Sequence, residues 1–139
     1  MADYWQHWIS IGETAGARMP KIFYVNWFRK DETGGFVWPG FGENARVLEW
    51  IFNRCEGSAD AIDTPIGLLP TLDGINFEGL NLSETDIATL LKVDIDGWRS
   101  ELPLIEDYYR TFGDGVPQAL YDELTQLKLR LETAEVGVA

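Results

Sequence analysis

The sequence has only one cysteine and one histidine in 139 residues, and this scarcity excludes several kinds of chemistry. Cys55 has no second cysteine in the chain with which to form an intramolecular disulfide. A nucleophilic pair would need His7 to activate Cys55. However, Cys55 follows an apolar helical stripe, so we expect an inert, partly buried thiol. His7 lies on the polar side of a predicted first helix, and we expect it at the surface.

Long apolar runs are lacking as well. No stretch approaches the roughly 18 apolar residues of a membrane span, and residues 1–3 open without the basic and apolar blocks of a secretory signal. We therefore expect a cytoplasmic protein without membrane contact. The composition, 45% hydrophobic and 13% aromatic, is typical of a folded chain with a core.

Positive charge is scarce, and the formal net charge is -12. Residues 1–55 hold six Lys or Arg against six Asp or Glu, whereas residues 56–139 hold five against seventeen. Nucleic-acid phosphates would be repelled by a surface of this sign, so we expect no nucleic-acid partner. The acidic second part is expected to be solvated surface.

The chain also lacks the consensus GxxxxGK(S/T), whose backbone amides and lysine cradle nucleotide phosphates. Asp94 and Asp96 are not followed by the later carboxylates of an EF-hand, so helix capping explains them more simply than a calcium loop. The other carboxylates form no unique pair suited to glycoside cleavage. The residues alone therefore single out no catalytic residue and no metal ligand in this chain.

Aromatic residues and glycines are abundant in one place, residues 26–46, which read NWFRKDETGGFVWPGFGENAR. Five aromatic rings lie there among four glycines and one proline. Rigid apolar ring faces beside backbone that permits close approach would suit a flat ligand such as a purine base. The same spacing fits an ordinary hairpin with an aromatic core and glycine turns, so spacing does not decide between the two.

The exact residues of this segment favour a ligand-binding site over an ordinary hairpin. The segment closely resembles the guanine-binding segment of the GTP-dependent phosphoenolpyruvate carboxykinases. The resemblance covers residues 1 to about 131 in family order, through PKIFYVNWFRK at 20–30, WPGFGENARVLEW at 38–50, TPIG at 64–67 and DELTQLKLRL at 122–131. The first two strings are specific to this family, whereas the last two would be weak evidence for it by themselves.

This resemblance implies that residues 1–139 are a single C-terminal fragment of the family's GTP-binding domain, with a guanine-pocket segment at 26–46 and a helical remainder at 47–139. The parent would be a monomeric lyase that converts oxaloacetate and GTP into phosphoenolpyruvate, carbon dioxide and GDP, with manganese and magnesium assisting. Its phosphate-binding loop, metal ligands and active-site lid lie upstream of the matching region. We expect the fragment to have as partners a guanine nucleotide and the remainder of the parent, and to be inactive alone.

The resemblance also implies which residues bind the nucleotide: Trp27, Phe28, Phe36, Phe41, Gly42, Glu43 and Asn44. The three phenylalanines would enclose the base, with Trp27 in support, and the Asn44 amide would recognise guanine. Asn44 also suits a helix start, where its side chain would cap backbone amides, and both roles stay open. For Glu43 we prefer a favourable interaction with the positive end of the following helix. Ala45 departs from the family, where serine is frequent.

Residue periodicity predicts an α+β fold, a short β-hairpin with about four or five helices, forming part of a larger C-terminal nucleotide-binding domain. A first helix is expected over residues 3–16, with Tyr4, Trp8 and Ile11 on its apolar face. We expect residues 21–28 to pair with 35–38 around a turn at 31–34. Further helices are predicted from Glu43 to about Gly57, after a capping box at 83–86, around Pro103, and after Pro117. Residues 63–67 are expected to be extended.

An alternative from another class remains. The chain could be a freestanding, non-enzymatic binding module whose aromatic hairpin takes a sugar, a peptide or a partner protein. Competition by GDP favours the nucleotide hypothesis, and a response to sugars favours the module.

Overall fold

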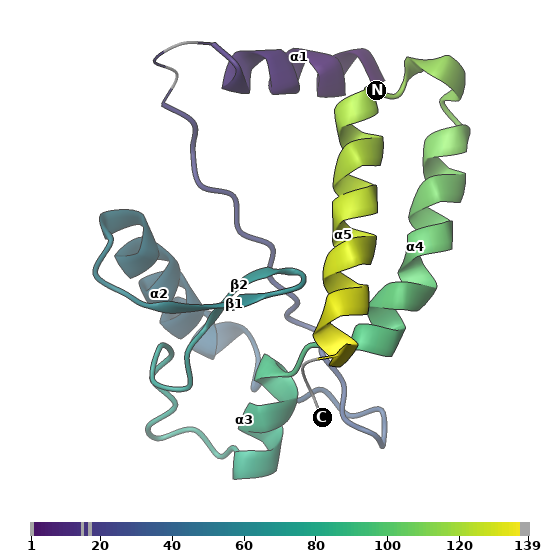
Figure 1. Cartoon of the computed structure of the whole chain (residues 1–139). Coiled ribbons are helices and arrows are strands. Elements are labelled where there is room, and N and C mark those ends of the chain that lie inside the picture. Colours follow the sequence, from purple (N-terminus) through teal and green to yellow (C-terminus); the bar gives the residue numbers. More distant parts are fainter. Residues whose placement is uncertain (1, 15, 17, 137–139) are drawn as a thin grey trace. The chain divides into compact units, whose positions relative to one another are not determined.

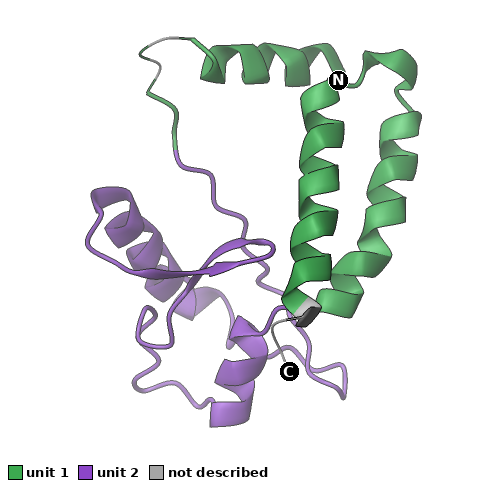
Figure 2. Ribbon diagram, viewed as in Figure 1, with its two compact units in different colours: residues 1–20, 94–139 green, residues 21–93 purple. Residues whose placement is uncertain are grey.

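The computed structural model describes residues 2–14, 16 and 18–136. They form two compact units, residues 1–20 with 94–139 and residues 21–93 (Figure 2). The described part contains five α-helices and one two-stranded antiparallel sheet (Figure 1), which confirms the α+β class. None of its helices combines the length and the apolar character needed to cross a membrane.

The first unit contains α1 (Ala2–Gly12), α4 (Ile95–Arg110) and α5 (Gln118–Val136). The helices α4 and α5 run antiparallel and side by side, joined through a short 3-10 turn at Gly113–Gly115 (Figure 1). The Asp94 carboxylate accepts a hydrogen bond from the Gly97 amide at 3.0 Å, which confirms capping at the start of α4. Pro103 lies inside α4 without ending it. On α5, Leu131 is fully buried.

The apolar face of α1 differs from the prediction. Tyr4 and Trp8 are 63% and 59% exposed. Trp5 instead packs against the α4 end, with its ring 4.9 Å from Phe112 and 6.1 Å from Tyr109. Helical periodicity could not choose between these faces, because aromatic residues lie on both. The contact with α4 determines that the face carrying Trp5 is the packed one.

The second unit, residues 21–93, contains α2 (Asn44–Glu56), the hairpin β1 (Ala61–Thr64) and β2 (Gly67–Pro70), and α3 (Glu84–Leu91). The helix α2 ends as predicted at Gly57, whose φ of 80° is left-handed backbone that glycine adopts without strain. At the start of α3, the predicted capping box is present, because Ser83 and Asp86 exchange hydrogen bonds.

The regular hairpin lies where we did not predict it. Strands β1 and β2 pair antiparallel from Ala61 opposite Pro70 to Thr64 opposite Gly67. Of residues 63–67, which were expected to be extended, 63, 64 and 67 lie in the strands and 65–66 form the turn. The predicted strand over residues 21–28 is wrong, because this segment forms no ladder in the described structure. Of the predicted pairing, one isolated bridge between Lys30 and Phe36 remains, although the turn at 31–34 is in place.

Residues 21–28 are nevertheless anchored by alternate side chains. Phe23 packs edge-on against the buried Trp50 of α2, with ring centroids 6.0 Å apart. Lys21 donates its ammonium hydrogens to the carbonyls of Arg54 and Cys55, at the negative end of α2. On the other side of the segment, Tyr24 is 93% exposed. The backbone that leads to the aromatic segment is therefore held against α2 by one face only.

Candidate functional site

The aromatic segment turns back on itself at Asp31, whose carboxylate organises the turn. One carboxylate oxygen accepts hydrogen bonds from the Thr33 amide at 2.8 Å, the Thr33 hydroxyl at 2.7 Å and the Gly35 amide at 3.0 Å. These bonds, that of the Thr33 hydroxyl first, lower the pKa of Asp31 below its usual value of 3.8. Gly34 takes the left-handed conformation, with φ of 87°, that the turn requires. The sequence therefore encodes this turn locally.

The turn brings Phe28 and Phe36 together. Their rings meet edge to face with centroids 5.9 Å apart, although 70% of Phe28 and 63% of Phe36 remain exposed. The Lys30 ammonium lies 5.5 Å from the centroid of the Phe36 ring, where a cation is attracted by the ring face. Two of the three predicted phenylalanines thus form one exposed aromatic pair beside a positive charge.

The next two residues of the segment face the interior. Val37 and Trp38 are 6% and 7% exposed, and the Trp38 ring lies 6.4 Å from that of Trp27. The Trp38 indole Nε1 donates a hydrogen bond of 2.8 Å to Asn44 Oδ1. Trp27 thus packs against a buried residue, and its support of a bound base stays a prediction. The bond between Trp38 and Asn44 was not predicted from the sequence.

After Pro39 the chain enters a 3-10 turn, Phe41–Glu43, which leads directly into α2. Gly40 makes this possible with φ of 116°, in the region that favours glycine. Phe41 projects from the turn with 92% of its surface exposed, and within the described residues its ring contacts neither Phe28 nor Phe36. The three phenylalanines are thus presented to solvent rather than assembled into a closed slot.

Asn44 is the first residue of α2, as predicted, but its side chain does not cap the helix. The residue at the N-cap position is Glu43, which makes no side-chain cap bond. Instead, the Glu43 carboxylate pairs with Arg46 at 2.7 Å, and the same guanidinium donates to the Asn76 carbonyl at 2.7 Å. Glu43 thus lies at the positive helix end as expected. The link through Arg46 to residue 76 was not foreseen, because periodicity carries no information about distant loops.

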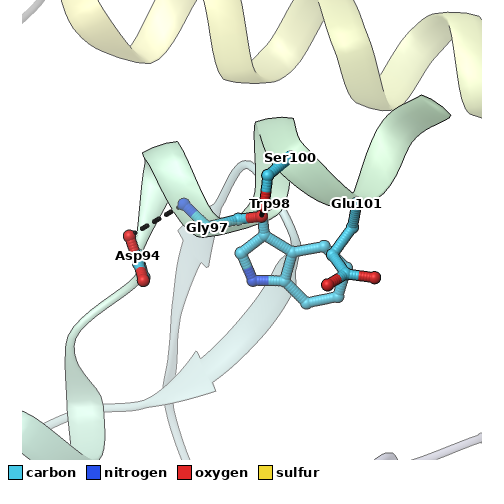
Figure 3. A pocket seen from close by; sticks show the side chains of 5 residues that line it. All are labelled: Asp94, Gly97, Trp98, Ser100 and Glu101. Atoms are coloured by element: carbon cyan, nitrogen blue, oxygen red, sulfur yellow. Dashed lines mark hydrogen bonds between the residues drawn. The ribbon is translucent and has the colours of Figure 1, made fainter. Parts of the chain in front are cut away.

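Two cavities of the described part lie away from the aromatic segment. One, of about 220 Å³, is an open hollow at the start of α4, lined by Asp94, Gly97, Trp98, Ser100 and Glu101 (Figure 3). Asp94 and Glu101 give it negative charge, and Asp94 already accepts the Gly97 amide. The other, of about 490 Å³, lies between α4 and α5. Neither includes a residue of the aromatic segment, and the acidic lining of the first is unfavourable for nucleotide phosphates.

Cys55, His7 and the carboxylates were the other candidates for a reactive or metal-binding site. Cys55 is exposed, so the prediction of a partly buried thiol is wrong. It lies in the last turn of α2, which ends at Glu56. His7 is exposed on α1, as expected. Throughout the described residues, no group of three or more His, Cys, Asp or Glu side chains is placed to hold a metal ion.

Comparison with known proteins identifies the family. Residues 1–130 match the model of the phosphoenolpyruvate carboxykinase C-terminal P-loop domain. The chain belongs to the phosphoenolpyruvate carboxykinase family. Relatives named phosphoenolpyruvate carboxykinase (GTP) include those of Treponema pallidum strain Nichols, 50% identical over 137 residues, and Chlamydia trachomatis serovar D, 50% identical over 133. The protein of that name from Paenarthrobacter aurescens is 48% identical over 130 residues.

The match covers nearly all of this chain and a small part of each carboxykinase. It takes in 97% of the chain for Treponema pallidum, 95% for Chlamydia trachomatis and 93% for Paenarthrobacter aurescens. The chain spans only 22%, 22% and 21% of those proteins. The family description names a P-loop domain, whereas a GxxxxGK(S/T) sequence does not occur in these 139 residues. Within the carboxykinase family this chain is therefore a C-terminal piece whose aromatic segment is its distinctive feature.

Proposed function

We propose that this chain supplies the guanine-binding part of a phosphoenolpyruvate carboxykinase. The whole enzyme converts oxaloacetate and GTP into phosphoenolpyruvate, carbon dioxide and GDP, and this part holds the base without contributing a catalytic group. The observation that carries the proposal is the exposure of three phenylalanines, Phe28, Phe36 and Phe41, at 70%, 63% and 92% on one segment. Exposed apolar rings that gather on one segment mark binding sites, whereas rings exposed singly are ordinary on protein surfaces.

Stacking supplies the affinity in this proposal. A base stacked on an aromatic side chain gains about 1–3 kcal/mol. Phe28 and Phe36 already stand in edge contact at 5.9 Å, and their turn is fixed by Asp31, so little order has to be gained on binding. Phe41 follows the turn on the glycine-flanked stretch 40–42, from which it closes on the base. Trp27 supports the segment from behind through its contact with Trp38.

The stretch around Gly42 approaches the edge of the base. Gly42 has an ordinary φ, and a side chain there would meet no atom within 4 Å, so neither backbone strain nor packing within the chain requires glycine. Close approach of a ligand to the backbone is a reason that remains. Asn44 follows at the start of α2, and its amide faces the base edge. Glu43 acts through its backbone and through its pairing with Arg46, which fixes the start of the helix.

Positioning is the chemical contribution of this chain. A base held in place brings the attached phosphates to the reacting groups in one orientation, which lowers the entropic part of the barrier. In this proposal the phosphate-binding lysines and the manganese and magnesium ligands are supplied by the remainder of the carboxykinase. The parent acts as a cytoplasmic monomer, with the nucleotide and this chain's own continuation as the relevant partners.

An NMR titration of the isotopically labelled chain with GDP, with ADP as control, tests the proposal. We expect saturable shifts at Phe28, Phe36, Phe41 and Asn44 with GDP and weaker ones with ADP. A dispersed spectrum that does not respond to millimolar GDP contradicts a guanine site in this chain. Shifts of the same residues with an oligosaccharide, but not with GDP, favour the freestanding binding module instead.

A further inference from the structure

Trp38 and Asn44 form a hydrogen-bonded pair at the base of the aromatic segment. The indole Nε1 donates to Asn44 Oδ1 at 2.8 Å, and Trp38 is only 7% exposed. Asn44 is partly exposed at the first position of α2. The pair therefore joins a buried side chain to one that reaches the surface beside the proposed guanine site.

This bond determines which way the Asn44 amide faces. An indole nitrogen can only donate, whereas an asparagine amide offers one accepting oxygen and two donated hydrogens. Trp38 therefore requires Oδ1 to point inward, and Nδ2 with both hydrogens to point away. Within the described residues Nδ2 has no partner, so its hydrogens are available to a ligand. An unconstrained asparagine could turn over and present its oxygen instead.

We propose that Trp38 is a specificity-determining positioning residue, which locks Asn44 as a hydrogen-bond donor toward position 6 of the purine. The inference rests on the proposed function and identifies how the site selects its base. Guanine carries a carbonyl acceptor, O6, at this position, whereas adenine carries an amino donor. A locked donor faces an acceptor in guanine and another donor in adenine, where both polar groups lose a partner.

A simpler role for Trp38 is that of an apolar core residue. Trp50 provides the matched comparison, because it is 5% exposed in the same unit and also donates its indole hydrogen, to the Asp60 carbonyl at 3.3 Å. Trp38→Phe and Trp50→Phe each remove one indole donor from the interior. If Trp38 acts only by packing, the two variants should change nucleotide binding in the same way.

The test compares inosine diphosphate with ADP, because their bases differ at position 6 while the 2-amino group is absent from both. Dissociation constants for these and for GDP are measured by NMR titration of the whole chain and of the variants. The wild-type chain should prefer inosine diphosphate over ADP by about tenfold, the scale of one hydrogen bond gained or lost. Trp38→Phe should bring this ratio close to one, because the amide is then free to turn. Trp50→Phe should leave the ratio unchanged.

Asn44→Asp provides a second variant that keeps the Trp38 bond and needs no change in the core. One carboxylate oxygen accepts the indole hydrogen and the other presents an acceptor to the base, so the preference should reverse in favour of ADP. An unchanged ratio in both Trp38→Phe and Asn44→Asp, in a wild-type chain that binds GDP, overturns the inference alone. A wild-type chain without a saturable response to GDP overturns the proposed function and the inference together.

Discussion

Phe41→Ala should weaken guanine-nucleotide binding while leaving the stability of the chain almost unchanged. The ring is 92% exposed and, within the described residues, packs on no other ring, so its removal uncovers almost no buried surface. Surface substitutions of this kind change the free energy of unfolding by less than about 0.5 kcal/mol. The loss of one base-stacking contact, about 1–3 kcal/mol, should lower the affinity for GDP by about 5- to 140-fold.

Val37→Ala is the matched control, because Val37 lies four positions earlier and is only 6% exposed. The substitution removes two methyl groups, worth about 1.6 kcal/mol at roughly 0.8 kcal/mol each before any cavity term. It should therefore lower the free energy of unfolding while the preference for GDP over ADP persists. Urea denaturation followed by tryptophan fluorescence gives the stability, and NMR titration gives the affinity. Equal GDP affinity in Phe41→Ala and the wild type would refute the assignment of Phe41, and a loss of stability as large as that of Val37→Ala would refute its exposed placement.

Other predictions concern the turn and the helices. Because the pKa of Asp31 is lowered, its hydrogen bonds should hold above pH 3.8 and be lost as the pH falls through a midpoint below that value, which the Thr33 and Gly35 amide shifts report. A midpoint at or above 3.8 would contradict the turn. Leu131→Ala removes a fully buried side chain and should lower the free energy of unfolding by about 2–5 kcal/mol. In the control Leu129→Ala, a side chain that is 48% exposed, circular dichroism during urea denaturation should show a much smaller loss. Asp94→Ala removes the cap of α4 and should cost about 1 kcal/mol in the same assay, and no change would argue against capping.

Local signals in the sequence predicted those features that are made by neighbouring residues. The turn at Asp31, the capping box at Ser83, the cap at Asp94 and the glycine end of α2 all depend on contacts over a few positions. The hydrogen-bonding groups that form them belong to these neighbouring residues themselves. Each was therefore placed correctly from the sequence.

The hairpin was misplaced because strand formation depends on a partner as well as on propensity. Residues 21–28 have the aromatic and β-branched composition of a strand, but in the described structure no backbone lies beside them to complete a ladder. The less strand-like residues 61–64 and 67–70 pair because a two-residue connection at Pro65 and Ile66 brings them together. Propensity alone could not rank these two segments.

The candidate site could be predicted only in part, because it too depends on contacts with residues that are not neighbours in the sequence. The resemblance selected Asn44, and its place at the start of α2 followed from periodicity. The direction of its amide could not be predicted, because that depends on how the glycine-rich loop at 40–42 returns Asn44 to Trp38. This contact decides against capping, since the oxygen that would cap the helix accepts the indole hydrogen instead, and ligand recognition by Asn44 stays a prediction.

During synthesis, α1 is made well before the residues on which it packs. Trp5 packs on Phe112, which lies 107 positions later, so α1 leaves the ribosome long before its docking surface exists. At about 5–20 residues per second, the wait is roughly 5–20 s. The second unit, residues 21–93, is completed within that interval from contacts that lie closer in sequence and close faster. The aromatic segment at 26–46 can therefore form before α1 and α4 have met, and during this period the aromatic side chains of α1 are exposed to water.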